Sequence, residues 1–134
     1  MEKEETEFDE MLSPLLNEEL IEGVFFLDRT GQKMFSNESL ACSSFVAEEG
    51  INLVGFFRNE SSISCSSRFT FCGKQFQIFQ KTALCLQAIQ QRTGYGLIAR
   101  SLIAGTLIIL YRPAFHAPSI FSIVEDFCCR ILSA

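Results

Sequence analysis

The residues that could carry out chemistry are few and far apart in this sequence of 134 residues. His116 is the only histidine, and positions 61–124 contain no acidic residue, so a Ser-His-Asp triad lacks obvious partners. The stretches Cys72–Lys74 and Gly94–Gly96 match neither a P-loop nor a G-x-G-x-x-G motif. The acidic pairs Glu18–Glu19 and Glu48–Glu49 fit solvated surface charge. The sequence therefore predicts that the protein is not an enzyme.

The six cysteines show no C-x-x-C spacing, and one histidine with scattered cysteines does not make a zinc site. The first ten residues, MEKEETEFDE, are too acidic and polar for a signal peptide. We therefore expect reduced thiols that serve as small apolar residues, and neither a metal nor a cofactor. Cys128 and Cys129 would point in different directions on a helix. The other cysteines are Cys42, Cys65, Cys72 and Cys85.

The composition indicates one globular domain over residues 1–134, because 48% of the residues are hydrophobic. No apolar run reaches the roughly 18 residues of a membrane span. Phe8–Leu16 has helical spacing that Pro14 interrupts, which predicts a short or kinked helix. Asn17–Glu22 would continue as a helical turn or linker. Gly23–Asn37 reads as a β-hairpin whose turn places Gly31 where a positive φ is needed.

The middle of the chain is harder to assign. A helix is expected near Ile51–Phe57, although Gly50 and Gly55 weaken it. Asn59–Ser67 is a polar connector. Four short strands joined by tight turns then follow, which predicts an antiparallel meander because short turns link antiparallel neighbours.

The C-terminal part predicts a buried strand that leads into a helix. Thr106–Tyr111 is apolar at nearly every position, as in a strand covered on both faces. Pro113 and Pro118 enclose a corner on which His116 should be exposed, and Pro118 suits the first turn of a helix. Apolar residues at helical spacing follow Pro118 as far as Ile131.

The net charge of −5 is unevenly distributed along the chain. Residues 1–60 hold 14 acidic residues, whereas residues 61–124 hold none and six basic ones. Either this is ordinary solvated charge, or the strand-rich half carries a cationic face for an acidic protein partner. Six scattered bases on an anionic chain do not favour nucleic acid. The six are Arg68, Lys74, Lys81, Arg92, Arg100 and Arg112.

The order of these elements resembles that of profilins. Three stretches carry the resemblance: GVFFLDRTGQKMFSN at 23–37, RFTFCGKQFQIFQKTALCLQAIQQRTGYGLIARSL at 68–102, and LIILYRPAFHAPSIFSIVEDFCCRIL at 107–132. The resemblance implies a profilin-like α+β fold with a central antiparallel sheet of about six to seven strands. It also implies N- and C-terminal helices on one face and a shorter helix on the other.

The resemblance implies binding of monomeric actin, regulation of actin assembly and faster nucleotide exchange on actin. It places the chain in the cytoplasm and the cytoskeleton, as a monomer. The family often has Lys or Arg where this chain has Gln75 and Gln91, and Phe121 replaces a polar residue, so a divergent actin partner fits. The actin-binding residues carried over by position are Gln75, Gln77, Gln91, Arg92, His116 and Phe121.

Profilins also bind polyproline through stacked aromatic residues between the two terminal helices. Here Phe8, Met11, Met34 and Arg130 stand in place of Trp, Tyr, Trp and Tyr or His. The resemblance therefore implies weak or altered binding of proline-rich proteins such as formins. Phosphoinositide binding is typical of the family, but a net charge of −5 opposes strong binding.

An alternative is a roadblock- or longin-like scaffold that binds small GTPases or trafficking machinery. Such scaffolds also begin with helix, two strands and helix. Three strands after the middle helix would fit that scaffold, and four would fit a profilin. Roadblock folds usually pair, whereas profilins usually do not.

Overall fold

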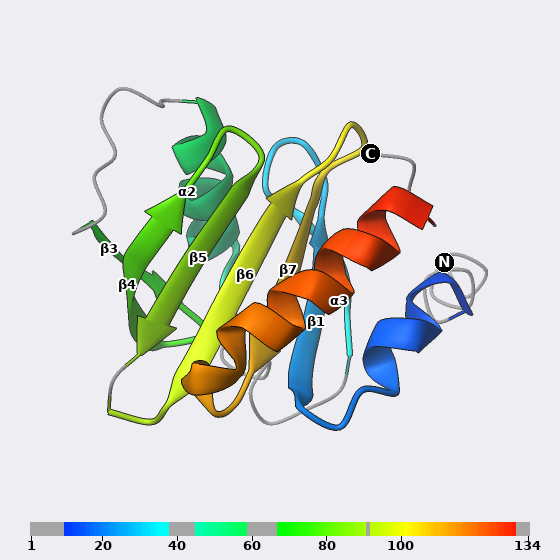
Figure 1. Cartoon of the computed structure of the whole chain (residues 1–134). Helices are drawn as coiled ribbons and strands as arrows, with labels where there is room; N and C mark the ends of the chain where they lie inside the picture. The colour runs from blue at the N-terminus through cyan, green and yellow to red at the C-terminus, as the bar shows by residue number, and fades with distance from the viewer. Residues whose placement is uncertain (1–9, 38–44, 59–66, 91, 131–134) are drawn as a thin grey trace.

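A computed structural model describes residues 10–37, 45–58, 67–90 and 92–130 of the chain. Its centre is a seven-stranded sheet in the order β2-β1-β7-β6-β5-β4-β3 (Figure 1). Every neighbouring pair is antiparallel. The strands are β1 (Ile21–Leu27), β2 (Lys33–Ser36), β3 (Arg68–Phe71), β4 (Lys74–Lys81), β5 (Cys85–Gln90), β6 (Tyr95–Ser101) and β7 (Thr106–Tyr111).

The predicted β1–β2 hairpin is confirmed. Gly31 has a φ of 100°, which is why glycine suits this turn. The Asp28 carboxylate accepts hydrogen bonds from the backbone N–H groups of Thr30 and Gln32 at 2.9 and 3.0 Å. β1 begins at Ile21, inside the segment expected to be a helical turn or linker. Apolar residues in β1 face both sides of the sheet, and this pattern extends the strand towards the N-terminus.

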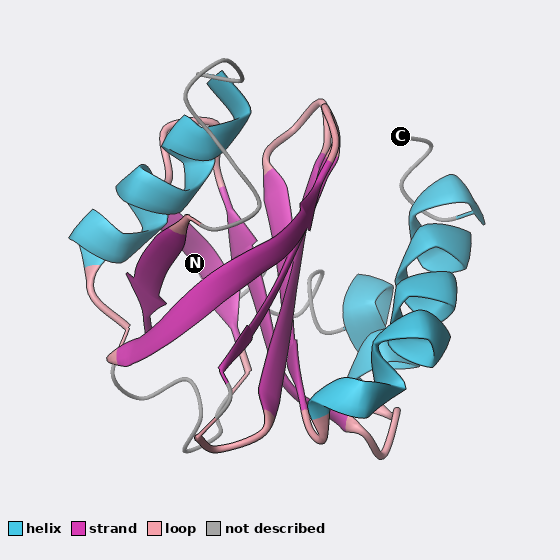
Figure 2. Ribbon diagram, turned by 60° about the vertical axis from the view of Figure 1, so that its left-hand side comes forward, coloured by secondary structure: helices cyan, strands magenta, loops and turns pink. Residues whose placement is uncertain are grey.

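The two terminal helices cover one face of the sheet (Figure 2). These are a helical segment over residues 10–16 and α3 (Ala117–Arg130), which follows the short 3-10 turn η3 (Ala114–His116). Their buried side chains form a core with those of β1 and β7, as expected for amphipathic helices on a sheet. The helical contributions to this core include Leu12, Leu15, Ile120, Val124, Phe127 and Cys128.

The N-terminal helical segment continues across Pro14. Proline lacks the N–H that would bond the carbonyl four residues earlier, that of Glu10. The Ser13 hydroxyl donates to that carbonyl instead, at 3.1 Å. The expectation of a short helix therefore holds for the described part, whereas Phe8 lies outside the described residues.

α2 (Ala47–Arg58) covers the other face of the sheet. α2 starts four residues before the predicted helix and includes Gly50. Gly50 does not interrupt the helix, because the helix packs so closely on the β1–β2 turn that only glycine fits at this position. A Cβ on Gly50 would lie 2.3 Å from the carbonyl oxygen of Gly31. The Glu49 carboxylate accepts hydrogen bonds from the backbone N–H groups of Cys72 and Gly73, at 2.8 and 3.1 Å. These bonds fasten α2 to the β3–β4 turn.

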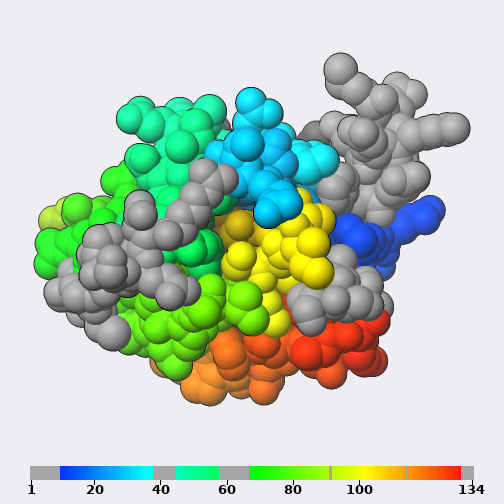
Figure 3. Space-filling model, turned by 90° about the horizontal axis from the view of Figure 1, so that it is seen from above, coloured from blue at the N-terminus to red at the C-terminus, as the bar shows by residue number. Residues whose placement is uncertain are grey.

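Five strands follow α2, one more than the four of the predicted meander. The fifth is the buried strand Thr106–Tyr111, which continues the meander without a break. Cys85 and Cys128 are buried free thiols and Cys129 is an exposed one, so the two adjacent cysteines do point apart. Residues 59–66 and Ile131 lie outside the described residues. No helix in the described part of the chain has the length and apolarity needed to cross a membrane. The β1–β2, β4–β5 and β6–β7 turns lie side by side at one end of the sheet (Figure 3).

Candidate functional site

On the face that carries α3, the part of the sheet near β4 is left uncovered. α3 lies over β6, β7 and β1, and leaves β4 and the end of β5 at Ile89 and Gln90 open (Figure 1). Phe76 and Ile78 of β4 are buried against the α2 side, whereas Gln75 is exposed and Gln77 is half-buried on the opposite side. The alternation predicted for this strand is therefore confirmed.

Gln75, Gln77 and Arg92 line one hollow of about 310 Å³. Gln77 pairs with Arg68 on β3 and with Ile89 on β5, which places these cross-strand neighbours on the same face. None of the lining residues is acidic. Gln91 lies outside the described residues. We call this surface the open face, and its residues are Arg68, Gln75, Gln77, Ile89, Gln90 and Arg92.

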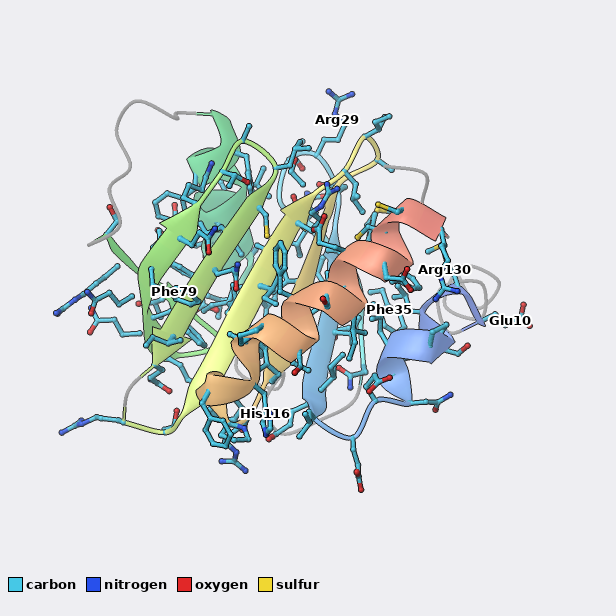
Figure 4. All side chains as sticks on the ribbon, viewed as in Figure 1. Glu10, Arg29, Phe35, Phe79, His116 and Arg130 are labelled. Carbon is cyan, nitrogen blue, oxygen red and sulfur yellow. The ribbon has the colours of Figure 1, made fainter. Side chains whose placement is uncertain are left out.

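A β-bulge extends the open face along β4. The register shifts between Ile78 and Gln80, and Gln80 pairs with Gln87 of β5. The Gln87 amide donates to Gln80 Oε1 at 3.4 Å. Phe79 remains exposed beside them (Figure 4). The predicted site did not include these three residues, because a bulge leaves no clear mark in an alternating sequence.

The corner before α3 presents a different residue from the one predicted. His116 is half-buried rather than exposed, and its ring packs on that of Phe115 with 4.4 Å between ring centroids. Phe115 is the exposed member of the pair, with 78% of its surface accessible. An apolar residue such as Phe115 is usually expected in the core. Here it lies in the turn η3, and its side chain is exposed.

Phe121 lies on the side of α3 that borders the open face. It is half-buried and packs against the core beneath the helix. Glu125 is one turn further along the same stripe, and it reaches Arg100 on β6. The structure therefore brings Gln75, Gln77 and Arg92 together in one hollow, and places Phe121 on the adjoining helix flank.

The cationic half of the chain is less cationic at the surface than its sequence indicates. Arg100 is buried and its Nε lies 2.7 Å from Glu125 Oε2. Burial is the largest influence on the pKa of Arg100 and lowers it, but the hydrogen bond and the charge of Glu125, together with the nearby thiols, outweigh burial, so the net direction is upward. Arg112 pairs with Glu22 at 3.1 Å. Arg68 and Arg92 are the two bases that line the hollow of the open face.

The region between the two terminal helices differs from the predicted polyproline site. Met11 is half-buried against the core, and Arg130 is exposed and pairs with Asp126 at 2.6 Å. Met34 is 44% exposed and lies at an irregularity of the β1–β2 pair, where the register shifts between Phe26 and Leu27. Its neighbour Phe35 pairs with Phe26 on the terminal-helix face (Figure 4).

Solved profilin structures have the same arrangement of helices and strands. Profilin IA of Acanthamoeba castellanii superposes with a TM-score of 0.74 and 16% identity, over 96% of each chain. This chain has the profilin fold. Profilin of Schizosaccharomyces pombe superposes with a TM-score of 0.72 and 15% identity, over 90% of this chain and 94% of that one. No protein-family model matches the chain, and no curated protein matches its sequence.

Several solved structures with the profilin fold include a partner. LokiProfilin2 in complex with rabbit actin has a TM-score of 0.74 and 14% identity, over 95% of this chain and 96% of that chain. Mouse profilin IIa in complex with a double repeat from the FH1 domain of mDia1 has a TM-score of 0.64 and 10% identity, over 90% and 92%. The profilin fold and the five strands after α2 do not favour the roadblock- or longin-like alternative.

Proposed function

We propose that this chain binds monomeric actin through the open face and thereby regulates actin assembly in the cytoplasm. The observation that carries the proposal is the hollow lined by Gln75, Gln77 and Arg92. It lies near β4, in the part of the sheet that α3 leaves uncovered. An apolar sheet face is normally covered by the chain itself, whereas a polar face of an antiparallel sheet can stay open to solvent and is accessible to a partner. Profilin-fold structures solved with rabbit actin support the choice of partner.

The chemistry of the open face suits an acidic protein. Arg68 and Arg92 supply positive charge, and no carboxylate lines the hollow. The amides of Gln75 and Gln77 both donate and accept hydrogen bonds, which suits a polar interface. Complementary charge at such a face increases the rate of encounter more than the final affinity.

The corner would supply the apolar contact. Phe115 is exposed next to His116, and Phe121 flanks the open face on α3. Aromatic side chains that a partner buries are frequent anchors of binding energy at interfaces. Gln91 lies outside the described residues, and only the resemblance to profilins makes it a candidate for this contact.

Binding of proline-rich partners such as formins is proposed to be weak. A polyproline groove needs flat aromatic faces, whereas Phe35 is buried and Met11, Met34 and Arg130 carry no aromatic ring. We also expect the chain to act as a monomer, without catalysis or a cofactor, and to bind phosphoinositides weakly because its net charge is −5.

The experiment that tests this function combines co-sedimentation with immobilised monomeric actin and a pyrene-actin assembly assay. The expected result is retention of the chain and slower spontaneous assembly. A chain that is not retained by actin and does not slow its assembly would contradict the proposal. The same preparation measures nucleotide exchange on actin, which we expect to be faster in the presence of the chain.

A further inference from the structure

The end of the sheet opposite Arg92 and His116 carries a second distinctive surface. Because the strands alternate in direction, the β1–β2, β4–β5 and β6–β7 turns all emerge at that end (Figure 3). The end of α2 joins them, since Val54 and Phe57 line a hollow with residues of the β6–β7 turn. We call this end the turn surface, and its residues are Arg29, Phe57, Lys81, Leu84, Leu102 and Ile103.

Apolar side chains are exposed on two adjacent turns of the turn surface. Ile103 is 81% exposed and Leu84 is 54% exposed. The backbone N–H of Ser101 donates to the carbonyl of Leu84 at 2.7 Å, which holds the two turns beside each other. A single exposed apolar residue needs no explanation, but here the two lie on neighbouring turns and Ile103 lines a hollow.

The hollow has a volume of about 310 Å³ and a rigid wall. Val54, Phe57, Leu102 and Ile103 supply apolar lining. Gly105 presses the β6–β7 turn onto β1, because a Cβ there would lie 2.0 Å from the Leu27 carbonyl oxygen. Such a turn is held in place before any partner arrives, which lowers the entropic cost of binding.

Positive charge borders the hollow. Arg29 lines it, at the tip of the β1–β2 turn beside the β6–β7 turn (Figure 4). Lys81 lies over the ring of Phe57, with 4.9 Å from Nζ to the ring centroid. No lining residue is acidic. The carboxylate of Asp28, next to Arg29, is engaged by the backbone of Thr30 and Gln32.

We propose that the turn surface binds an acidic peptide segment of a partner protein that inserts an apolar side chain into the hollow. The apolar lining would accept that side chain, and Arg29 and Lys81 would attract the flanking carboxylates. A membrane is a poorer fit because the site is concave and the chain carries a net charge of −5. The hollow of the turn surface shares no lining residue with the hollow of the open face, so both could be occupied together.

A peptide-display selection tests this inference. The full chain is immobilised and challenged with a random library of short peptides, and the best binder is titrated by fluorescence anisotropy. The expected peptides combine Asp or Glu with Leu or Phe. Ile103→Asp and Leu84→Asp should each weaken binding about tenfold or more. Val46→Asp is the matched control, because Val46 is as exposed as Leu84 but lies at the other end of α2.

Several outcomes would overturn the inference. These are enrichment of basic or neutral peptides, no enrichment, or equal weakening by the Val46 control. Peptide-induced NMR shifts confined to the open face would also refute it. A dimer in sedimentation that Ile103→Asp abolishes would make a second copy the occupant, and phosphatidylserine-vesicle binding that the same change abolishes would make it a membrane. Failure of actin binding would not affect these results, because the two surfaces are separate.

Discussion

The Arg100 Nε lies 2.7 Å from Glu125 Oε2, and only 7% of the Arg100 side chain is exposed. Arg100 also donates from Nη1 to the Ser101 carbonyl at 2.9 Å. This ion pair connects β6 to α3 on the flank next to the open face. It therefore positions the helix on which Phe121 lies.

Glu125→Gln should lower the free energy of unfolding by about 2–3 kcal/mol, because it leaves a buried guanidinium without a charged partner. Urea denaturation measures this. Asp126→Asn is the matched control, since it breaks only the exposed pair with Arg130. It should cost less than about 0.5 kcal/mol. Equal effects of the two changes would show that burial of Arg100 contributes nothing.

Stability should fall at alkaline pH because of two buried thiols. Burial raises the pKa of Cys85 to about 12 and that of Cys128 to about 11, from an ordinary value of 9.0. Above pH 9 the unfolded chain loses these protons while the folded chain keeps them, so the free energy of unfolding decreases as pH rises. The slope would reach about 1.4 kcal/mol per pH unit for each thiol.

Urea midpoints at pH 7, 9 and 10.5 measure this dependence on pH. Cys128→Ala should make the alkaline loss smaller, whatever its effect at pH 7. Cys129→Ala should leave the loss unchanged, because Cys129 is exposed. A midpoint that stays constant up to pH 10.5 would contradict the assignment.

Gly96→Ala should be strongly destabilising. Gly96 pairs with Tyr111 across the sheet, and a Cβ on Gly96 would lie 2.2 Å from Tyr111 Cζ. The ring would have to move within a packed core, at a cost of about 1–3 kcal/mol or more. Gly55→Ala, at an open position in α2, should instead stabilise by about 0.5–1 kcal/mol. Thermal denaturation compares the two, and a smaller loss at Gly96 than at Gly55 would be inconsistent with this packing.

Decaproline should bind weakly. Phe35 is buried, and the exposed Met34 beside it has no aromatic ring for a proline to stack on. Isothermal titration calorimetry with the peptide measures this, and Met34→Ala should leave the small signal unchanged. An affinity comparable to that of a typical profilin would show that other residues build the groove.

Local patterns predicted much of this fold. The Gly31 hairpin, the alternation of Gln75 to Ile78 and the proline corner before α3 are all set by residues close in sequence. Long-range contacts decided the rest. The start of α2 depends on the approach of Gly50 to Gly31, which lies on a different element.

The hollow of the open face was predictable in part. Gln75, Gln77 and Arg92 do line one hollow, because turn and strand spacing fix their places. The sequence did not show that Arg100 and Arg112 form ion pairs and so add less positive charge to the surface, since their partners Glu125 and Glu22 are distant in sequence. Two register irregularities, at Met34 in β2 and at Phe79 in β4, interrupt the alternation of side chains, and a single sequence does not reveal them.

Titration of fluorescently labelled monomeric actin with the wild-type chain, Arg92→Glu and Arg130→Glu is the most direct measurement. The two variants make the same change in charge, but Arg92 lines the open face and Arg130 lies at the far end of α3. Wild type and Arg130→Glu should bind alike, and Arg92→Glu should bind about tenfold or more weakly. Absence of wild-type binding, or unchanged binding by Arg92→Glu, would contradict actin recognition by the open face.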